Sequence, residues 1–169
     1  MLRADSSFRQ IEDLYRQHGA SLLLFAVSVC GERSYAQDAV QQVFLKLIQT
    51  GSLRRALDVK AYLFACVRNT VVNDMKSRQR TVSLEAERIW FEPPRHDYAA
   101  EENLRHALQG LPDDQREAIV LHVWGELTFS QIAEVLNTSA NTAASRYRYA
   151  IAKLRDAMLP KENTNVSSR

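Results

Sequence analysis

Glycine and proline are scarce in this chain, which has only 5 Gly and 4 Pro among 169 residues. Apolar runs are also short: the longest, Leu22 to Val29, is interrupted by Ser28, whereas a membrane-spanning helix needs about 20 apolar residues. No segment alternates apolar and polar residues as a half-buried strand does. These absences argue against membrane-spanning and sheet architectures and predict an all-α protein. Charges at Arg3 and Asp5, without a small-residue cleavage pattern, predict no secretion signal.

Cysteine and histidine are too few and too scattered to predict a metal site. Cys30 and Cys66 lie within apolar helical periods, so we expect both thiols to be buried and reduced, as in the cytoplasm. No Gly-rich phosphate loop or nucleophile motif is present. We therefore expect a chain that is not an enzyme and uses no cofactor, metal or small-molecule substrate. The four histidines, none at ligand spacing, are His18, His96, His106 and His122.

Charge is distributed unevenly, although the formal net charge is only +2. Residues 51–80 carry seven basic and two acidic side chains, and residues 129–169 carry six and three. Between these blocks, residues 81–128 carry four basic and ten acidic side chains. Two basic blocks around an acidic one predict two separate contacts with a polyanion, although two solvated helical faces would give the same pattern.

Apolar residues recur at steps of three and four through most of the chain, which predicts helices joined by short loops. Gly31 and Gly51 suit the ends of the first two helices, because glycine readily adopts the left-handed conformation of a helix stop. The predicted helices are residues 6–31, 34–50, 58–80, 98–111, 112–124, 129–136 and 141–158.

Three helix starts carry capping patterns. Asp58 is a suitable N-cap for the third helix. Ser34 with Gln37, and Thr128 with Gln131, have the spacing of capping boxes.

Residues 81–98 interrupt the helical period with Pro93, Pro94 and scattered acidic residues, which predicts a flexible linker. The expected organisation is therefore two small helical domains, at residues 1–80 and 99–160, with a polar tail at residues 161–169.

The second domain has the layout of a helix-turn-helix: a short capped helix, a turn and a longer helix. Ala133 provides a small side chain where the two helices would cross, and Asn137 suits a left-handed turn. A structural hairpin shares this pattern, but polar residues at the start of the second helix favour contacts with phosphates and base edges. The predicted DNA contacts are Asn141, Thr142, Ala144, Ser145, Arg146 and Arg148.

A line of aromatic, amide and cationic residues follows the helix at residues 58–80. Its members are four, three, four, three and four residues apart, which places them along one helix face. A wholly structural helix could carry such a line, so the line alone does not decide a function. Its residues are Tyr62, Cys66, Asn69, Asn73, Lys76 and Arg80.

Over roughly residues 8–80 and 99–158 the chain resembles the extracytoplasmic-function sigma factors, the smallest class of bacterial RNA polymerase specificity subunits. In the first half, DAVQQVF (38–44) is similar to the Asp-x-x-Gln-Glu-x-Phe pattern of conserved region two. The string AYLFACVRNTVVNDMKSRQR (61–80) is similar to that region's aromatic-Leu, Arg-Asn and basic-run helix.

In the second half, LPDDQREAIVLHVW (111–124) resembles the Leu-Pro-x-x-x-Arg opening of region four. Residues 127–155 resemble the helix-turn-helix of that region. A lone helix-turn-helix would be weak evidence, but both halves occur in order with a charged linker between them.

The resemblance implies a subunit that binds core RNA polymerase and directs promoter recognition, promoter melting and transcription initiation without catalysis of its own. The helix at residues 34–49 would bind the clamp helices of the largest polymerase subunit. The residues implied in that contact are Asp38, Gln41, Gln42 and Phe44, with Phe44 acting from the buried side.

The resemblance also assigns the two basic blocks to promoter DNA. The third helix and the loop before it would melt and hold the −10 element, because aromatic, amide and cationic side chains can capture unstacked bases. The second helix of the helix-turn-helix would bind the −35 element. The implied −10 contacts are Arg54, Arg55, Tyr62, Asn69, Asn73, Lys76 and Arg80.

Several residues depart from the family pattern. Gln42 replaces a usual acid, Asn73 a common aspartate and Asn137 a common glycine, while Ala143 and Ala144 replace a common valine and a basic residue. These departures leave the class intact and the promoter sequence unpredicted. The resemblance further implies an anti-sigma partner, often membrane-bound. The alternative of a stand-alone helix-turn-helix regulator explains the second half but not the polar line on the third helix.

Overall fold

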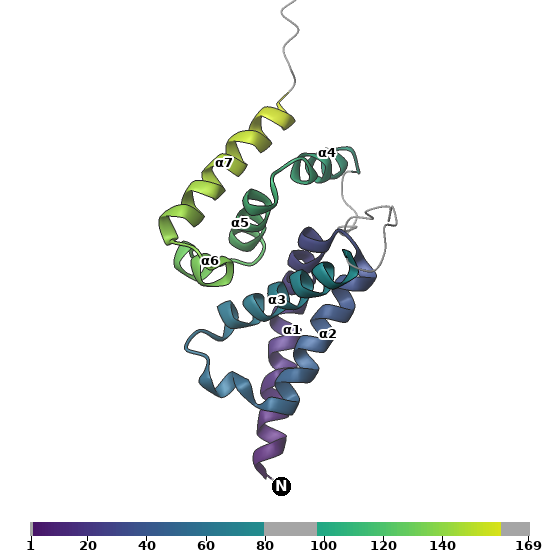
Figure 1. The fold of residues 1–169 in the computed structure, drawn as a ribbon, viewed down its shortest axis with the longest axis vertical. Helices are drawn as coiled ribbons and strands as arrows, with labels where there is room; N and C mark the ends of the chain where they lie inside the picture. Colours follow the sequence, from purple (N-terminus) through teal and green to yellow (C-terminus); the bar gives the residue numbers. More distant parts are fainter. Residues whose placement is uncertain (1, 80–97, 160–169) are drawn as a thin grey trace, which may run out of the picture.

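A computed structural model describes residues 2–79 and 98–159, and it is all-α in both ranges (Figure 1). The predicted linker, apart from its last residue, the predicted tail and Arg80 lie outside the described residues. The helices are α1 (Leu2–Cys30), α2 (Arg33–Thr50), the 3₁₀ helix η1 (Ser52–Arg55), α3 (Val59–Gln79), α4 (Tyr98–Gln109), α5 (Asp113–Val123), α6 (Phe129–Leu136) and α7 (Ala140–Met158).

Helices α1, α2 and α3 form one packed group, as the sequence predicts for a three-helix domain. Phe25 of α1 and Phe64 of α3 are fully buried, and their rings meet edge to face with centroids 5.7 Å apart. Ala36 and Ala39 of α2 are also buried, which lets that helix lie close to its neighbours. The apolar periods of the three helices therefore meet in one core.

Local sequence decides where these helices begin and end, with one departure from expectation. Gly51 has φ of 61° and closes α2, and Asp58 caps α3 by accepting a hydrogen bond from the Ala61 N–H at 2.9 Å. The capping box predicted at Ser34 is wrong. Because α2 already begins at Arg33, Ser34 lies inside the first turn, and its hydroxyl instead donates to the Glu32 carboxylate at 2.8 Å.

Helices α4 to α7 form the second group, in which α7 packs against α4, α5 and α6. Ile132 of α6 and Ala143 and Ala150 of α7 are fully buried. Beside them the His122 ring stacks on Phe129 at 4.6 Å. The group is the expected helix-turn-helix, α6 and α7, preceded by two helices that pack against α7.

The helix-turn-helix follows its sequence pattern closely. Thr128 and Gln131 form the predicted capping box at the start of α6. Asn137 ends α6 in the left-handed conformation, with φ of 51°. Ser139 then caps α7 by accepting from the Thr142 N–H at 3.1 Å, a cap that the sequence analysis did not identify.

The two groups contact each other directly, through α1 with α5 and α3 with α6 (Figure 1). Arg116 of α5 is only 7% exposed, and its Nε donates to the Ser28 carbonyl of α1 at 2.9 Å. Glu117 is equally buried and accepts from Arg68 Nε of α3 at 2.5 Å. Buried charges of this kind are tolerated because each has a partner across the interface.

Two helix caps also join across this interface. One oxygen of Asp58 caps α3, and the other accepts from the Gln131 side chain at 2.7 Å. These hydrogen bonds, from the Ala61 N–H and from Gln131, lower the pKa of Asp58. Lys60 adds a contact from its Nζ to the Glu126 carbonyl at 3.3 Å. The N-terminal turns of α3 and α6 are thus tied together.

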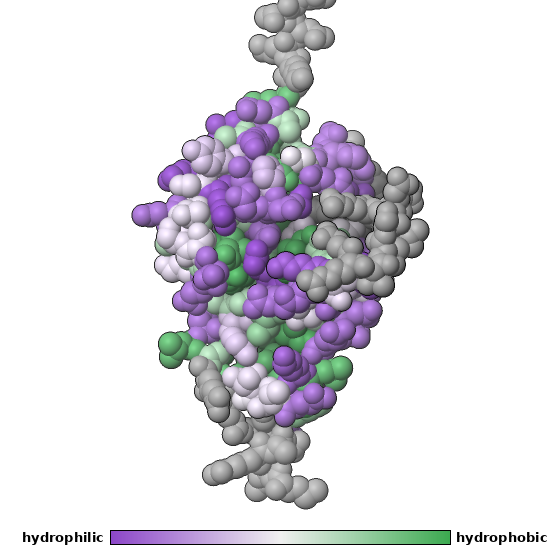
Figure 2. All heavy atoms as spheres, in the orientation of Figure 1, coloured by the Kyte–Doolittle hydropathy of each residue, from purple (hydrophilic) through white to green (hydrophobic). Residues whose placement is uncertain are grey.

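Hydrophilic atoms predominate on the face drawn in Figure 2, and hydrophobic ones gather in patches toward its lower half. The largest exposed apolar side chains on α2 are Leu45 and Ile48, at 57% and 43% exposure. Within the described parts of the chain, no helix is long and apolar enough to cross a membrane.

We expect alanine to be destabilising at Gly125 and stabilising at Gly19. A Cβ at Gly125 would lie 2.5 Å from the Leu121 carbonyl oxygen, so Gly125→Ala should lower the free energy of unfolding by about 1–3 kcal/mol. At Gly19, inside α1, a Cβ would meet only the Tyr15 ring at 3.6 Å, so Gly19→Ala should raise it by about 0.5–1 kcal/mol. Urea unfolding followed by circular dichroism measures both, and equal effects of the two changes would contradict this account.

Candidate nucleic-acid and polymerase interfaces

Helix α3 is fixed at both ends, which holds its polar line in one orientation. Asp58 caps its start, and Arg78 near its end lies over the Tyr35 ring of α2, 4.2 Å from the centroid. Arg78 also pairs with Glu32 at 3.6 Å. The Tyr35 hydroxyl donates to the Val71 carbonyl at 3.5 Å. Burial is the larger cause that raises the pKa of Tyr35 to about 12, and the nearby Asp74 carboxylate adds to it.

The described members of the polar line on α3 are exposed or half-buried. Asn69, Asn73 and Lys76 are exposed, and Tyr62 and Cys66 are half-buried beside them. Burial raises the pKa of the Cys66 thiol, so this cysteine stays protonated at neutral pH. The arrangement combines an aromatic side chain, two amides and a cation on one helix, which suits single-stranded nucleic acid.

The basic loop before α3 is observed as the 3₁₀ helix η1, which ends with Arg54 and Arg55. Three residues of the chain separate Arg55 from the start of α3, and the side chains of both arginines are outside the described part of the chain. Arg80, the last predicted member of the polar line, is outside it as well. Of the predicted −10 set, the described side chains are therefore those of Tyr62, Asn69, Asn73 and Lys76.

The start of α7 presents the predicted polar residues to solvent. Asn141 and Thr142 are exposed in the first turn, and Ala144 and Ser145 are half-buried. The Ser139 and Thr142 hydroxyls are 2.9 Å apart. This turn follows the left-handed Asn137, which positions the helix N-terminus at the surface of the molecule.

The two arginines of α7 have different surroundings. Arg148 is exposed, and its Nη2 donates to the Ser145 hydroxyl at 3.0 Å. Arg146 is half-buried, and its Nε pairs with the Asp114 carboxylate of α5 at 3.1 Å. The sequence grouped these arginines together, whereas the structure ties one of them to another helix.

The face of α2 that the sequence predicts to bind polymerase is polar with an apolar edge. Asp38, Gln41 and Gln42 are exposed. Phe44 is only 6% exposed and meets the Tyr15 ring edge to face at 5.0 Å, so it lies on the buried side of α2. Leu45 and Ile48 also lie exposed on this helix and were not among the predicted contacts, although both fall outside the buried apolar period.

A groove of about 480 Å³ runs between α1 and α2 beside this face. Its lining combines aromatic, aliphatic and amide side chains, so it could accept an amphipathic segment. The lining residues are Tyr15, Arg16, Gly19, Ala20, Leu23, Gln37, Val40 and Gln41.

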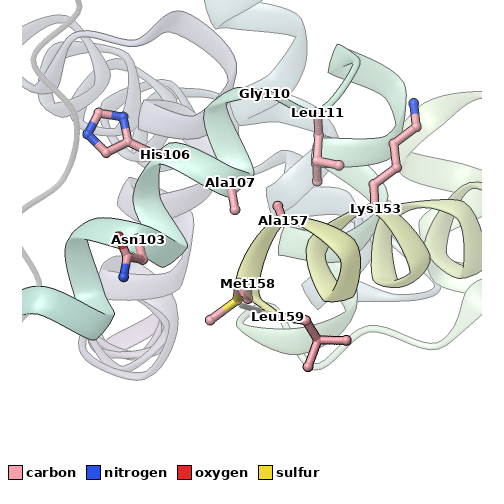
Figure 3. A pocket seen from close by; sticks show the side chains of 9 residues that line it. All are labelled: Asn103, His106, Ala107, Gly110, Leu111, Lys153, Ala157, Met158 and Leu159. Atoms are coloured by element: carbon pink, nitrogen blue, oxygen red, sulfur yellow. The ribbon is translucent and has the colours of Figure 1, made fainter. Parts of the chain in front are cut away.

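A second groove, of about 650 Å³, lies between α4 and the end of α7 (Figure 3). Ala107 stands on the α4 side and Ala157 on the α7 side, and the small side chains leave the space open (Figure 3). His106 and Lys153 bring polar groups to its rim, while Met158 is exposed nearby. In residues 2–79 and 98–159, no three His, Cys, Asp or Glu side chains gather to form a metal site.

Comparison with known families matches both halves of the chain. Residues 14–81 match the family described as Sigma-70 region 2, and residues 101–154 match Sigma-70, region 4. The first match contains α2, η1 and all of α3 that is described, and the second contains the helix-turn-helix.

Curated relatives of similar length support the same assignment. The chain is 31% identical to the ECF RNA polymerase sigma factor EcfG of Rhodopseudomonas palustris (strain TIE-1) over 139 residues, or 79% of this chain and 77% of the relative. It is 24% identical to the ECF RNA polymerase sigma factor SigM of Bacillus subtilis (strain 168), over 76% of this chain and 83% of the relative.

Solved structures share the fold. The sigma factor RpoE from Bartonella quintana, in complex with the anti-sigma factor NepR, superposes with a TM-score of 0.71 and 25% identity, covering 86% of this chain and 96% of that one. CnrH, in complex with the cytosolic domain of CnrY, gives a TM-score of 0.62 at 24% identity and covers 90% of each chain. With both conserved regions matched in order and the same fold, this chain belongs to the extracytoplasmic-function sigma factors of the sigma-70 family, non-enzymatic subunits that direct RNA polymerase to promoters.

Proposed function

We propose that three separate surfaces of this sigma factor divide the work of promoter-directed initiation. The domain at residues 1–80 binds polymerase through α2 and the −10 element through α3, and the domain at residues 99–160 binds the −35 element through α7. The observation that carries this proposal is that Asn69, Asn73 and Lys76 of α3 are exposed while the opposite face of α3 is buried in the core.

In this proposal the −10 element is held as a single strand. Tyr62 offers a partly exposed ring on which a base can stack, and amides beside it can hydrogen-bond to base edges. Cations at Lys76 and beyond attract the backbone phosphates. The full proposed set is Arg54, Arg55, Tyr62, Asn69, Asn73, Lys76 and Arg80.

The −35 element is bound as a duplex. The first turns of α7 carry the amides, hydroxyls and guanidinium groups that contact a major groove, and they are presented by a helix N-terminus that favours phosphate. The proposed contacts are Asn141, Thr142, Ala144, Ser145 and Arg148. Arg146 belongs to the same predicted set, but its Nε faces Asp114 of α5.

The exposed face of α2 binds the polymerase. Asp38 contributes a charge, and Gln41 and Gln42 contribute hydrogen bonds. Phe44 packs in the core and holds α2 in place against α1. Exposed Leu45 and Ile48 extend this face with apolar area, which is the combination found at protein interfaces. We further propose that the chain acts in the cytoplasm, where it meets the polymerase.

Contact with both promoter elements requires the two helix groups to separate. Elements centred at −10 and −35 are about 25 base pairs apart, which is roughly 85 Å of B-DNA. Here hydrogen bonds join the start of α3 to α6 and Arg68 of α3 to α5, so the pairs Arg68–Glu117 and Asp58–Gln131 have to break when the chain spans both elements. The observed arrangement is therefore a closed state.

A partner that stabilises the closed state would keep this sigma factor silent. The RpoE structure, which covers most of this chain, is a complex with an anti-sigma factor. By similarity we propose that this chain also binds an anti-sigma factor, which would cover polymerase-binding surfaces such as the face of α2.

The direct test of the proposed function is run-off transcription. The purified chain mixed with core RNA polymerase should start transcription at defined promoters, and mapping the start sites would give the two elements. A stand-alone regulator would bind duplex DNA but would not direct core enzyme. Failure to bind core polymerase would refute the proposal.

Neutralising the end of the α3 line should impair promoter opening more than −35 binding. In the double variant Lys76→Ala with Arg80→Ala, loss of two phosphate contacts should flatten the dependence of log K for promoter binding on log salt by about 1.4–1.8. Permanganate reactivity of unpaired thymines reports opening, and footprinting reports −35 occupancy. Arg16→Ala, an exposed cation on α1, should change neither; equal losses of opening and −35 binding would refute the division of roles.

Removing the charge of Glu117 should favour the open state. Glu117→Gln weakens the buried pair with Arg68 by about 1–2 kcal/mol, and the open population rises accordingly. Small-angle scattering should then show a larger radius of gyration, and the chain should assemble with core polymerase more tightly. Glu12→Gln is the matched control, because Glu12 forms an exposed pair with Arg16 inside α1. An unchanged radius for Glu117→Gln would mean that this pair does not hold the groups together.

A further inference from the structure

Arg146 is the one predicted DNA contact that the described structure ties to a different helix. Its Nε lies 3.1 Å from Oδ2 of Asp114, in the first turn of α5. Its side chain is 29% exposed, less than expected of an arginine directed into a groove. Arg148, two residues on, is exposed, and its hydrogen bond to Ser145 stays within α7.

The carboxylate of Asp114 is held on both sides. Its Oδ1 accepts from the Gln115 N–H at 2.9 Å, and its Oδ2 faces Arg146. An acidic residue is also stabilised in the first turn of a helix by the positive end of the helix dipole. Asp114, whose side chain is 49% exposed, thus provides a contact on α5 for Arg146 of α7.

Near its N-terminus the buried face of α7 consists of small side chains, and the larger buried Leu154 lies toward the other end of the helix. Ala143 and Ala150 are fully buried, and Arg146 lies three residues after the first and four before the second. Alanine side chains are too short to interlock with a neighbouring helix. On the other flank, Tyr147 packs edge to face on the His122 ring at 4.7 Å. Two side-chain contacts therefore restrain the rotation of α7: the ion pair of Arg146 with Asp114 and the packing of Tyr147 on His122.

We propose that Asp114 is a positioning residue for −35 recognition: by holding Arg146 through Nε, it sets the rotation of α7 that presents Asn141, Ser145 and Arg148 to the major groove. This inference rests on the proposed role of α7 in binding the −35 element. Arg146 then contributes to recognition through α5, and not through a contact of its own with DNA.

The competing assignment predicts effects of opposite sign. If Arg146 contacted DNA directly, Asp114 would compete for it, and removing the carboxylate would release the arginine and tighten binding. If Asp114 positions α7, removing it weakens specific binding. Binding to unrelated DNA, which depends on phosphate contacts alone, stays the same in the positioning case.

The test uses holoenzyme assembled from core polymerase and the full chain. Affinity is measured for a promoter mapped by run-off transcription and for the same DNA with its −35 element scrambled. Asp114→Ala and Arg146→Ala should each lower the affinity ratio of the two DNAs about two- to fivefold, the scale of a part-exposed ion pair. The double variant should lose no more than either single one, because both remove the same contact. Asp114→Asn, which keeps an acceptor for Arg146 Nε, should retain most of the ratio.

Asp156→Ala controls for the change in net charge, since Asp156 is an exposed acid near the other end of α7. It should leave the ratio unchanged, and all variants should show the salt dependence of the wild type. An Asp114→Ala ratio equal to or above that of the wild type would overturn the inference, as would a salt slope for Arg146→Ala that is flatter by about one. If wild-type holoenzyme does not distinguish the two DNAs, the −35 role of α7 fails together with the inference. Thermal unfolding of Asp114→Ala close to that of Asp156→Ala shows that loss of the ratio is not loss of the fold.

Discussion

The hydrogen bonds of Arg116 are the constraint around which both helix groups are arranged. This guanidinium is buried, so it is stable there only if its donors are satisfied. It donates to the Gln109 and Leu111 carbonyls at 3.3 and 3.1 Å, pairs with Asp113, and reaches Ser28 of α1. One side chain thereby closes the turn between α4 and α5 and attaches that turn to the other group.

The first turn of α5 consequently connects three parts of the molecule. Asp113 holds Arg116, which contacts α1, and the adjacent Asp114 holds Arg146 of α7. Next to them, Glu117 pairs with Arg68 of α3. Residues 113–117 therefore link the closed interface to the proposed recognition helix over a single turn and a half of helix.

Most of the fold could be predicted because its determinants are local. Apolar periods define the helices, and Asp58, the Thr128–Gln131 box and the left-handed Asn137 each act within four residues of their own position. The candidate site was predicted in outline for the same reason, since the line on α3 is a matter of helical spacing. The failure at Ser34 is also local: the N-cap of α2 is Glu32, two residues before the one that the capping pattern suggests.

The contacts between the groups could not be predicted, because they join residues far apart in sequence. Ser28 and Arg116 are 88 positions apart, and Asp58 and Gln131 are 73. No periodic or capping rule relates such positions, and each side chain has an adequate local explanation without its distant partner. The restraint on Arg146 was missed for this reason, as Asp114 suits a helix start whether or not an arginine faces it.

The two carboxylate oxygens of Asp58 accept hydrogen bonds from different helix groups, and this bears on whether the groups can separate and come together again. One oxygen serves the Ala61 N–H within α3, and the other serves Gln131 of the opposite group. Separation exposes the second oxygen to water, which replaces the lost donor, while the first stays in place. In the proposed open state α3 would hence keep its N-cap, and Asp58 would remain in position to accept from Gln131 again when the two groups come together.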